Sequence, residues 1–287
     1  MLVTGAYGGM GRAVTKALAQ NGYRVLALDK QAGEAVEGVF PIEADITEEA
    51  SVRAALAEAE KRTDTLFAIL HFAGIYLLDS LVEMDATAFR RILDVNFCGA
   101  FLVNKIFFPM LDQGSRILIT TSELAPLDPL PFTGMYAVTK GALDKYAYSL
   151  RMELQLLGIP VSVLRAGAVQ TQMLGVSTDA LDRFCEKTAL YSCNANRFRN
   201  IVNRVEARCV PPEKVAHKTL NILKARKPRF AYSLNRNPLL LLLNFLPKRL
   251  LLLILSKLPF LCVLRLCVQV VLTEECTMCF LKIRLQF

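Results

Sequence analysis

Short apolar runs recur along the first 164 residues, separated by longer segments whose apolar positions have helical spacing. Apolar runs of about four to eight residues, bounded by turn-forming residues, are typical of buried strands. We therefore predict strands at residues 1–4, 23–28, 38–43, 66–72, 115–121 and 160–164.

The segments between these strands predict helices at residues 11–20, 51–62, 89–111 and 135–157. In the first of them Val14, Ala17 and Leu18 share one face, and Gly22 follows as a stop signal. Strands that alternate with helices predict an α/β fold, a doubly wound parallel sheet covered by helices on both faces. Ligands of such sheets bind at the carboxyl ends of the strands.

The pattern changes after the sixth strand. Residues 175–210 are polar and helical in character, which fits either a lid over a substrate pocket or an insertion that only packs on the surface. Pro211 and Pro212 then introduce a further helix. We expect one catalytic domain at residues 1–235 and an apolar, basic, helical extension at residues 236–287.

Composition narrows the classes of function. Hydrophobic residues make up 53% of the chain, the mean hydropathy is +0.36, and the excess lies at residues 238–272. The net charge of +8 comes largely from basic residues at 197–249, but no aromatic residues alternate with them as base stacking requires, so we expect no nucleic-acid partner. Eight cysteines show no disulfide framework and no signal peptide is evident, so we expect a cytoplasmic protein. Cys276 and Cys279 are too isolated to indicate a metal site.

A glycine-rich turn joins the first strand to the first helix. It runs from Thr4 and Gly5 to Gly9, Met10 and Gly11. Glycines allow close backbone approach to a ligand, and the amides at a helix N-terminus attract phosphate. The placement inside a βαβ unit makes this turn a predicted pyrophosphate site.

Acidic residues follow the next two strands. Asp29 ends the second strand, where a carboxylate can bind both hydroxyls of an adenosine ribose and repel a 2′-phosphate. Gly8 provides no basic side chain for that phosphate, so the sequence favours NAD over NADP. Asp45 and Ile46 could hold an adenine, although an ordinary turn before Thr47 is the alternative.

The spacing of Tyr136 and Lys140 is the most informative feature. Residues four apart share a helix face, so the ammonium should lie near the phenol and lower its pKa, as acid/base chemistry requires. Two further polar residues support this interpretation. Ser122 closes the fifth strand, and Asn96 lies within the third predicted helix.

Together these residues resemble the short-chain dehydrogenase/reductase family over residues 1–235. The resemblance consists of the TGxxxGxG turn at 4–11, Asp29, Asp45, Ala73 with Gly74, Asn96, Ser122, the Tyr136-xxx-Lys140 pair, and Gly167 with Thr171. It implies a Rossmann-type fold, NAD as the cofactor and, from family habit, a homo-oligomer.

The resemblance also implies roles for individual residues. Tyr136 would be the general acid/base, Lys140 would lower its pKa and bind the nicotinamide ribose, Ser122 would orient the substrate oxygen, and Asn96 would hold a relay water. Contacts to the cofactor would come from the glycine turn, the two acidic strand ends and the loops after the fourth and sixth strands: Thr4, Gly5, Gly9, Met10, Gly11, Asp29, Asp45, Ile46, Gly74, Gly167, Val169 and Thr171.

Three features depart from the family pattern. Phe72 stands where an asparagine is usual, which removes one polar contact supporting the central strand. Ala166 stands where a proline is usual before Gly167. Only three residues precede Thr4, so the first strand is short.

Residues 237–272 are not explained by the family core. Basic residues between leucine clusters suit an interfacial helix on anionic lipid, whereas packing on the enzyme's own core or an oligomer interface is the alternative. A Pro-Arg strand followed by leucine-rich basic helices is similar to steroid and retinol dehydrogenases, which implies a hydrophobic alcohol or ketone as substrate. The competing function is a non-catalytic dinucleotide-binding sensor or scaffold on the same fold.

Overall fold

The computed structural model describes residues 1–192, 199 and 209–253. The chain divides into two compact units, Met1–Asn237 and Pro238–Phe287. The first unit contains the whole sheet and all of the candidate site residues.

Seven strands form one parallel sheet in the order β3-β2-β1-β4-β5-β6-β7. Their bounds are β1 Leu2–Thr4, β2 Val25–Asp29, β3 Val39–Glu43, β4 Leu66–His71, β5 Leu111–Ser122, β6 Val161–Ala166 and β7 Ala231–Leu234. The central β1 pairs with β2 on one side and β4 on the other, so Val3 lies between Ala27 and Leu70. The predicted doubly wound α/β fold is confirmed.

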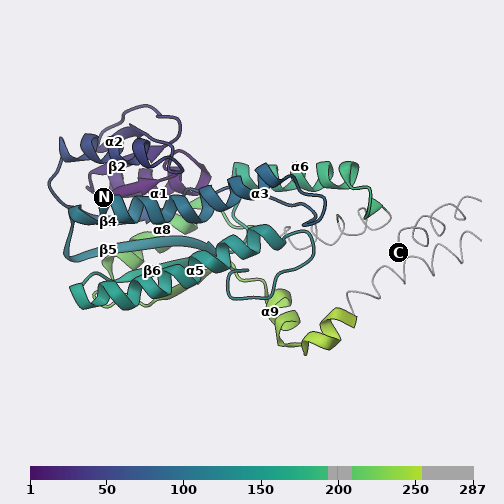
Figure 1. Ribbon diagram of the computed structural model, residues 1–287. Helices are drawn as coiled ribbons and strands as arrows, with labels where there is room; N and C mark the ends of the chain where they lie inside the picture. The colour runs from purple at the N-terminus through teal and green to yellow at the C-terminus, as the bar shows by residue number, and fades with distance from the viewer. Residues whose placement is uncertain (193–198, 200–208, 254–287) are drawn as a thin grey trace, which may run out of the picture. The chain divides into compact units, whose positions relative to one another are not determined.

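Helices cover both faces of the sheet (Figure 1). On one face, α1 (Gly9–Gln20) lies beside α8 (Pro212–Lys224). On the other face lie α2 (Glu49–Glu60), α4 (Gly99–Phe107) and α5 (Gly134–Leu154). Successive strand residues point to opposite faces, so Leu26 and Leu28 join one hydrophobic core while Val25 and Ala27 join the other. A sheet that is buried on both faces explains why the central residues of its strands are mostly apolar.

The helix predicted at residues 89–111 is interrupted. Its path comprises α3 (Ala86–Leu93), a π-helical turn at Asp94–Cys98, α4, and a final 3₁₀ turn at Phe108–Met110, after which Leu111 already belongs to β5. The whole segment from Ala86 to Met110 has the length and apolar composition of a membrane span. However, Val103 and Phe107 are fully buried in the core of the first unit, so this segment is a core helix of the α/β fold.

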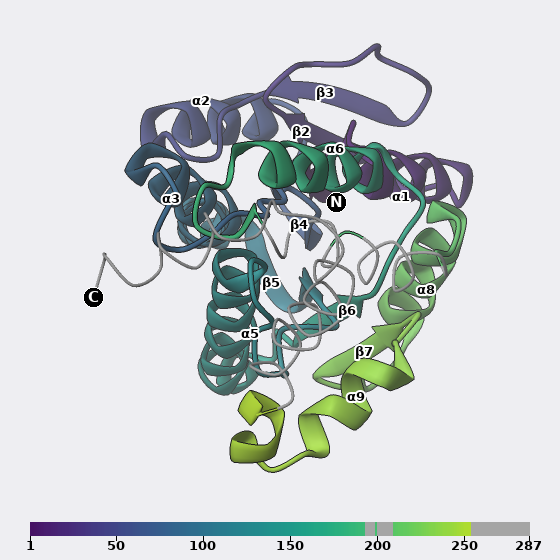
Figure 2. The ribbon, with the colours of Figure 1, turned by 90° about the vertical axis from the view of Figure 1, so that its right-hand side faces the viewer.

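The predicted lid begins with α6, at Gln172–Lys187. Figure 2 looks onto the carboxyl ends of the strands, and α6 crosses in front of them. The later part of the predicted lid, residues 193–198 and 200–208, lies outside the described residues.

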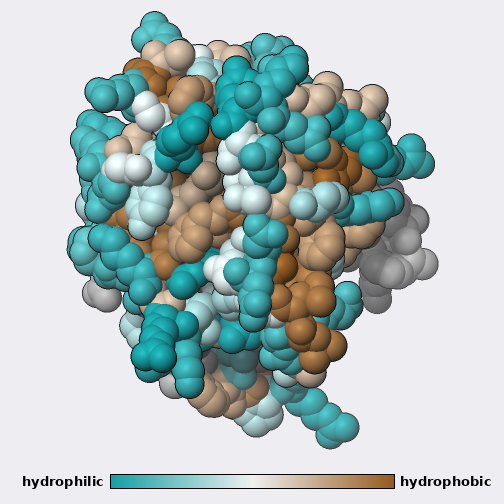
Figure 3. Space-filling view, turned by 90° about the vertical axis from the view of Figure 1, so that its left-hand side faces the viewer, coloured by the Kyte–Doolittle hydropathy of each residue, from teal (hydrophilic) through white to brown (hydrophobic). Residues whose placement is uncertain are grey.

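The second unit begins with α9, at Pro238–Phe245, and residues 254–287 of the predicted extension also lie outside the described residues. The opposite end of the molecule from Figure 2 is shown in Figure 3, where hydrophilic side chains surround separate hydrophobic patches.

Candidate active site

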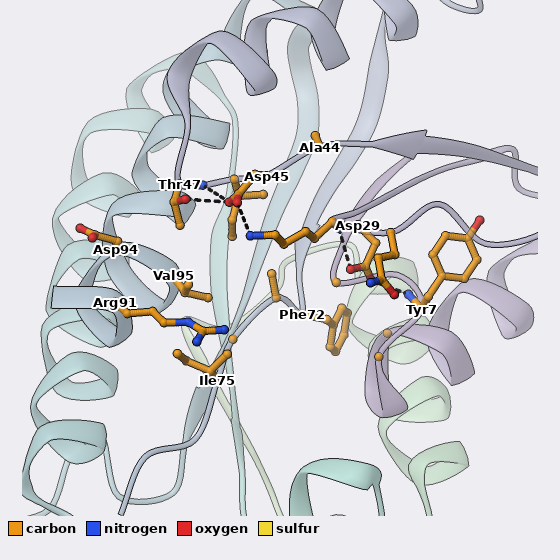
Figure 4. A pocket seen from close by; sticks show the side chains of 18 of the residues that line it. Tyr7, Asp29, Ala44, Asp45, Thr47, Phe72, Ile75, Arg91, Asp94 and Val95 are labelled. Atoms are coloured by element: carbon orange, nitrogen blue, oxygen red, sulfur yellow. Dashed lines mark hydrogen bonds and ion pairs between the residues drawn. The ribbon is translucent and has the colours of Figure 1, made fainter. Parts of the chain in front are cut away.

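A groove of about 1030 Å³ runs along the carboxyl ends of β1, β2, β3 and β4. Figure 4 shows its lining, with Asp29 and Tyr7 toward one side and Asp45 and Thr47 toward the other. The predicted residues Gly5, Gly9, Met10, Gly11, Asp29, Asp45, Ile46, Gly74 and Thr171 all line this groove. The structure therefore brings most of the predicted cofactor contacts together.

The glycine turn leaves no room for a side chain at Gly9 or Gly11. A Cβ atom on Gly11 would lie 1.9 Å from the carbonyl oxygen of Gly5, and one on Gly9 would lie 2.4 Å from Cβ of Thr171. Gly5 has φ +64°, a left-handed conformation that glycine adopts without strain. Because α1 begins at Gly9, its first amides meet the groove, as a bound pyrophosphate would require. The predicted pyrophosphate cradle thus fits the geometry of this turn.

Asp29 lies at the end of β2 and is fixed by two backbone amides. The Tyr7 N–H donates to Oδ2 at 2.9 Å and the Lys30 N–H donates to Oδ1 at 2.8 Å. These bonds hold the carboxylate beside the glycine turn, where the 2′ and 3′ hydroxyls of an adenosine ribose would fit.

Asp45 forms an ion pair with Lys30, a residue that the sequence did not indicate as part of the site. The Lys30 ammonium lies 2.6 Å from Oδ2 of Asp45, and both the amide and the hydroxyl of Thr47 donate to Oδ1. These hydrogen bonds lower the pKa of Asp45 to about 2. Ile46 is buried, and its side chain packs against Gly99.

Asn96 lies in the π-helical turn and joins the loop after β4 to α5. Its Oδ1 accepts from the Ile75 N–H at 2.8 Å, while Nδ2 donates to the Ile75 carbonyl at 3.0 Å and to the Thr139 hydroxyl at 3.2 Å. A Cβ atom on Gly74 would lie 3.3 Å from both Oδ1 of Asn96 and Nζ of Lys140. The π turn therefore turns the amide of Asn96 toward Gly74 and Lys140, and such turns are frequent at functional sites.

Tyr136 and Lys140 lie one helical turn apart on α5, with Nζ of Lys140 at 5.9 Å from the centroid of the Tyr136 ring. The buried Lys140 donates from Nζ to the carbonyl oxygen of Thr120 on β5 at 3.3 Å. Ser122, at the end of the same strand, hydrogen-bonds the Tyr136 phenol. The structure thus brings the predicted catalytic residues Asn96, Ser122, Tyr136 and Lys140 together from the π turn, β5 and α5.

Burial dominates the acid/base properties of this pair. It raises the pKa of Tyr136 to about 12, an effect that the negative charge of Glu123 increases and the hydrogen bond from Ser122 opposes. Burial also lowers the pKa of Lys140 to about 8. The sequence predicted that Lys140, one helical turn away, would lower the pKa of Tyr136. In the chain by itself the pKa is raised instead, because desolvation disfavours both the phenolate and the ammonium ion.

The loop after β6 supplies the other predicted contacts. Val169 is buried and forms a parallel bridge with Val210, and the Thr171 hydroxyl donates to the Val169 carbonyl at 3.4 Å. Gly167 donates from its N–H to the Leu234 carbonyl of β7 at 2.9 Å. Thr4 lies fully buried at the end of β1, where its hydroxyl accepts from the Ala73 N–H at 3.4 Å.

Phe72, at the position where the family has an asparagine, is nearly buried and lines the groove. Its N–H still donates to the Thr4 carbonyl at 3.0 Å, so the backbone contact between β4 and β1 is retained.

One aromatic side chain packs against Tyr136, and others cluster between α6 and the loop before α5; sequence reasoning missed them. The rings of Tyr76 and Tyr136 are 4.9 Å apart between centroids. Phe132, on the loop before α5, packs against Phe184 of α6 at 4.5 Å and against Tyr191 at 4.9 Å. These residues are far apart in sequence, so no local pattern marks them as a cluster. In the described part of the chain, no group of three or more His, Cys, Asp or Glu side chains is placed to hold a metal ion.

Comparison with known proteins agrees with this geometry. The family profile described as short chain dehydrogenase matches residues 1–182. The chain is 30% identical over 190 residues to the NADPH-dependent 1-acyldihydroxyacetone phosphate reductase of Schizosaccharomyces pombe, covering 63% of this chain and 64% of that protein. It is 32% identical over 197 residues to the estradiol 17-beta-dehydrogenase 2 of Rattus norvegicus, covering 64% of this chain and 51% of that protein. The chain thus spans about half to two thirds of the length of these curated relatives.

Solved structures share the fold. A 3-ketoacyl-(acyl-carrier-protein) reductase from Brucella melitensis, complexed with NADH, matches with a TM-score of 0.67 and 22% identity, over 81% of this chain and 95% of that one. A short chain dehydrogenase from Burkholderia cenocepacia in complex with NADP matches with a TM-score of 0.63 and 22% identity, over 82% and 87% of the two chains. With the profile match over residues 1–182, the chain belongs to the short-chain dehydrogenase/reductase family, and its relatives include a steroid dehydrogenase.

Proposed function

We propose that this chain is an oxidoreductase that transfers a hydride between NAD(H) and the carbon of a secondary alcohol or ketone. The observation that carries the proposal is the convergence of Tyr136, Lys140, Ser122 and Asn96 beside Gly74, at one end of a groove with a glycine cradle. A protein that only bound a dinucleotide would need the cradle but not these four side chains.

Each of the four residues has a distinct task in this proposal. Tyr136 exchanges a proton with the substrate oxygen, and Ser122, which hydrogen-bonds the phenol, orients that oxygen. Lys140 supplies positive charge near the phenol and reaches the nicotinamide ribose, while Asn96 holds the water through which the proton is replaced. The nicotinamide, when bound, accepts or supplies the hydride.

The arrangement around Asp29 supports NAD rather than NADP as the cofactor. The carboxylate is held by two amides next to the glycine turn, so a 2′-phosphate would meet its negative charge at close range. The cation that follows Asp29 in the chain, Lys30, forms an ion pair with Asp45 at 2.6 Å. In this proposal the pyrophosphate is held by Gly5, Gly9, Met10 and Gly11. The nicotinamide end contacts residues after β4 and β6, namely Gly74, Gly167, Val169 and Thr171.

The aromatic side chains support a hydrophobic substrate, of the size and rigidity of a steroid or retinoid. Tyr76 lies against Tyr136, and Phe132 joins the loop before α5 to Phe184 of α6. These rings can pack on a flat apolar ring system and exclude water from the reacting atoms. The helix α6, which crosses over the strand ends, then acts as the lid of the substrate site (Figure 2).

Residues 237–272 make peripheral contact with an anionic membrane in this proposal. No acidic residue lies between Arg236 and Thr273, whereas Lys248, Arg249, Lys257 and Arg265 alternate with leucine clusters. Phe245 and Leu252 are well exposed, at 85% and 65%, as side chains that enter a lipid surface would be. We also propose a homo-oligomer, supported by the exposed apolar side chains Phe101 and Phe108 near α4 and Tyr148 and Met152 on α5.

A substrate panel tests the proposed reaction. Oxidation of NADH, or reduction of NAD, would be followed by absorbance with sterols, retinoids and simple secondary alcohols and their ketones. We expect turnover of at least one hydrophobic substrate by the wild-type chain, and a loss of roughly 100-fold or more in Tyr136→Phe, because general acid/base catalysis contributes at least that factor. Binding of NADH to both proteins with equal turnover would contradict the role of Tyr136. NADH binding without turnover of any substrate would favour the non-catalytic alternative.

A further inference from the structure

Glu123 immediately follows Ser122, yet the proposed reaction leaves it without a task. Its N–H donates to the Ala166 carbonyl at 3.0 Å, which continues the pairing of β5 with β6 beyond the last strand residue. The side chain is partly buried. An acidic residue in this position has to be compensated by donors or by positive charge, since burial disfavours a carboxylate.

The carboxylate of Glu123 binds the chain after β7. Its Oε2 accepts from the Asn237 N–H at 2.6 Å. Two residues earlier, the Asn235 side chain donates from Nδ2 to the Ala168 carbonyl at 2.8 Å. Asn235 has φ +56°, a left-handed conformation that bends the chain back toward the end of β6. Residues 235–237 are therefore tied to both β5 and β6.

Gly167 shows how closely these segments approach one another. A Cβ atom at Gly167 would lie 2.0 Å from the carbonyl oxygen of Asn235 and 2.9 Å from Oε1 of Glu123. Glycine is thus required where the turn after β7 and the carboxylate both press against the end of β6. Burial raises the pKa of Glu123, while the Asn237 N–H and the charge of Arg236 oppose that shift.

We propose that Glu123 is a positioning residue, whose carboxylate clamps residues 235–237 against Gly167 and Ala168 and so shapes the wall that the nicotinamide ring meets. This proposal rests on the proposed function. A dinucleotide bound in the groove would extend from Asp29 and Asp45, near the ends of β2 and β3, toward Tyr136, so its nicotinamide half would reach the clamped segment. Its adenosine half would lie at the Asp29 end of the groove, away from the clamp, because β2 and β3 are separated from β6 by β1, β4 and β5.

Because the clamp should affect only the nicotinamide half of the dinucleotide, ligands with and without nicotinamide give a direct test. In Glu123→Ala, we expect the dissociation constant of NADH, measured by fluorescence titration, to rise roughly tenfold, the factor that one charged hydrogen bond of ordinary strength supplies. The dissociation constant of ADP-ribose, measured by calorimetry, should stay at the wild-type value because this molecule lacks the nicotinamide. Glu123→Gln keeps an acceptor for the Asn237 N–H and should restore most of the affinity for NADH.

A second pair of variants removes the donor instead of the acceptor. Asn237→Pro deletes the N–H that Glu123 accepts, and because Asn237 precedes Pro238 its backbone is already biased toward the extended region. Asn237→Ala keeps that N–H and is the matched control. We expect Asn237→Pro to weaken NADH binding as Glu123→Ala does, the control to resemble wild type, and the double variant Glu123→Ala/Asn237→Pro to be no weaker than either single variant.

The outcomes separate this inference from the function on which it rests. If NADH and ADP-ribose affinities fall together in Glu123→Ala, or if neither falls, the positioning role is wrong although the chain still binds the cofactor. Additive losses in the double variant would contradict the clamp as well. A wild-type chain that bound neither NADH nor ADP-ribose would instead overturn the proposed function and, with it, the role of Glu123.

Discussion

At the scale of single residues, the proposed role of Tyr136 ties the pH dependence of the reaction to its direction, because its phenol is buried. With its pKa raised to about 12 by burial, Tyr136 is protonated at neutral pH in the chain alone, and a protonated phenol can donate to a carbonyl oxygen. Oxidation of an alcohol needs the phenolate as a base. We therefore predict that kcat for oxidation rises steadily between about pH 7 and 10. Reduction at saturating NADH should change little or fall over the same range, and an oxidation rate that fell with rising pH would contradict this assignment.

In the proposed function, Asp29 sets the preference between NAD and NADP. Asp29→Asn keeps an oxygen that can accept from the Tyr7 N–H but removes the charge that repels a 2′-phosphate. We predict that the ratio of kcat/KM for NAD to that for NADP falls by about tenfold or more, since close charges contribute at least that much. Glu43→Gln, which neutralises an exposed carboxylate outside the groove, should leave the ratio unchanged. A wild-type chain that preferred NADP would show that Asp29 does not select the cofactor.

The sequence predicted the residues that line the groove better than the residues that pack around its Tyr136 end. The glycine turn, Asp29 and the spacing of Tyr136 and Lys140 each act within one element or one turn, so their residues identify them. Glu123 and the aromatic cluster could not be predicted, because their partners are more than 50 residues away in the chain. An acidic residue directly after Ser122 was the one local signal for the clamp.

At the scale of secondary-structure elements, a series of side-chain hydrogen bonds joins β4, α4 and α5. Nε2 of His71 lies 2.8 Å from Oδ1 of Asn104, and Nδ2 of Asn104 donates to the Tyr146 hydroxyl at 3.2 Å. Burial lowers the pKa of His71 from 6.5 to about 4. Protonation of His71 therefore favours the unfolded chain. The stability that neutral His71 permits is present above about pH 6.5 and is lost as the pH falls toward 4.

We predict that His71→Gln removes this acid sensitivity. Between about pH 6.5 and 4 the wild type should lose up to about 3 kcal/mol more unfolding free energy than the variant, since one pKa unit corresponds to about 1.4 kcal/mol. Urea unfolding at several pH values measures the difference. His217→Gln changes the exposed second histidine and should follow the wild type. Parallel curves for wild type and His71→Gln would show that His71 does not govern acid unfolding.

The order of strands and helices followed from hydrophobic periodicity, but the interruption around Asn96 did not. Apolar spacing over residues 89–111 fits a continuous helix and a π turn equally well. The turn is specified by hydrogen bonds between the Asn96 amide and the backbone of Ile75, which lies in the loop after β4. Sequence periodicity therefore predicts which segments are helical, whereas the break that turns a functional side chain depends on tertiary contacts.

At the scale of the whole molecule, the second unit is expected to decide where the enzyme works. Its leucine clusters and basic residues lie in a stretch without acidic side chains, which suits an anionic lipid surface. We predict that the full chain sediments with vesicles containing phosphatidylserine and is released by high salt, whereas a chain lacking residues 237–287 stays in the supernatant. Vesicles of phosphatidylcholine alone are the control. Equal partition of both chains would contradict membrane contact.

The central claim is that Tyr136 supports hydride transfer between NAD(H) and a carbonyl carbon, and a single-turnover experiment with deuterated NADH tests it most directly. A carbonyl substrate found in the panel is mixed with enzyme that has bound NADH carrying deuterium at the transferred position, and the product is analysed by mass spectrometry. The account predicts deuterium on the former carbonyl carbon with wild type, and transfer roughly 100-fold slower or more in Tyr136→Phe at equal NADH occupancy. Deuterium transfer at the same rate in both proteins, or a product without deuterium, would contradict it.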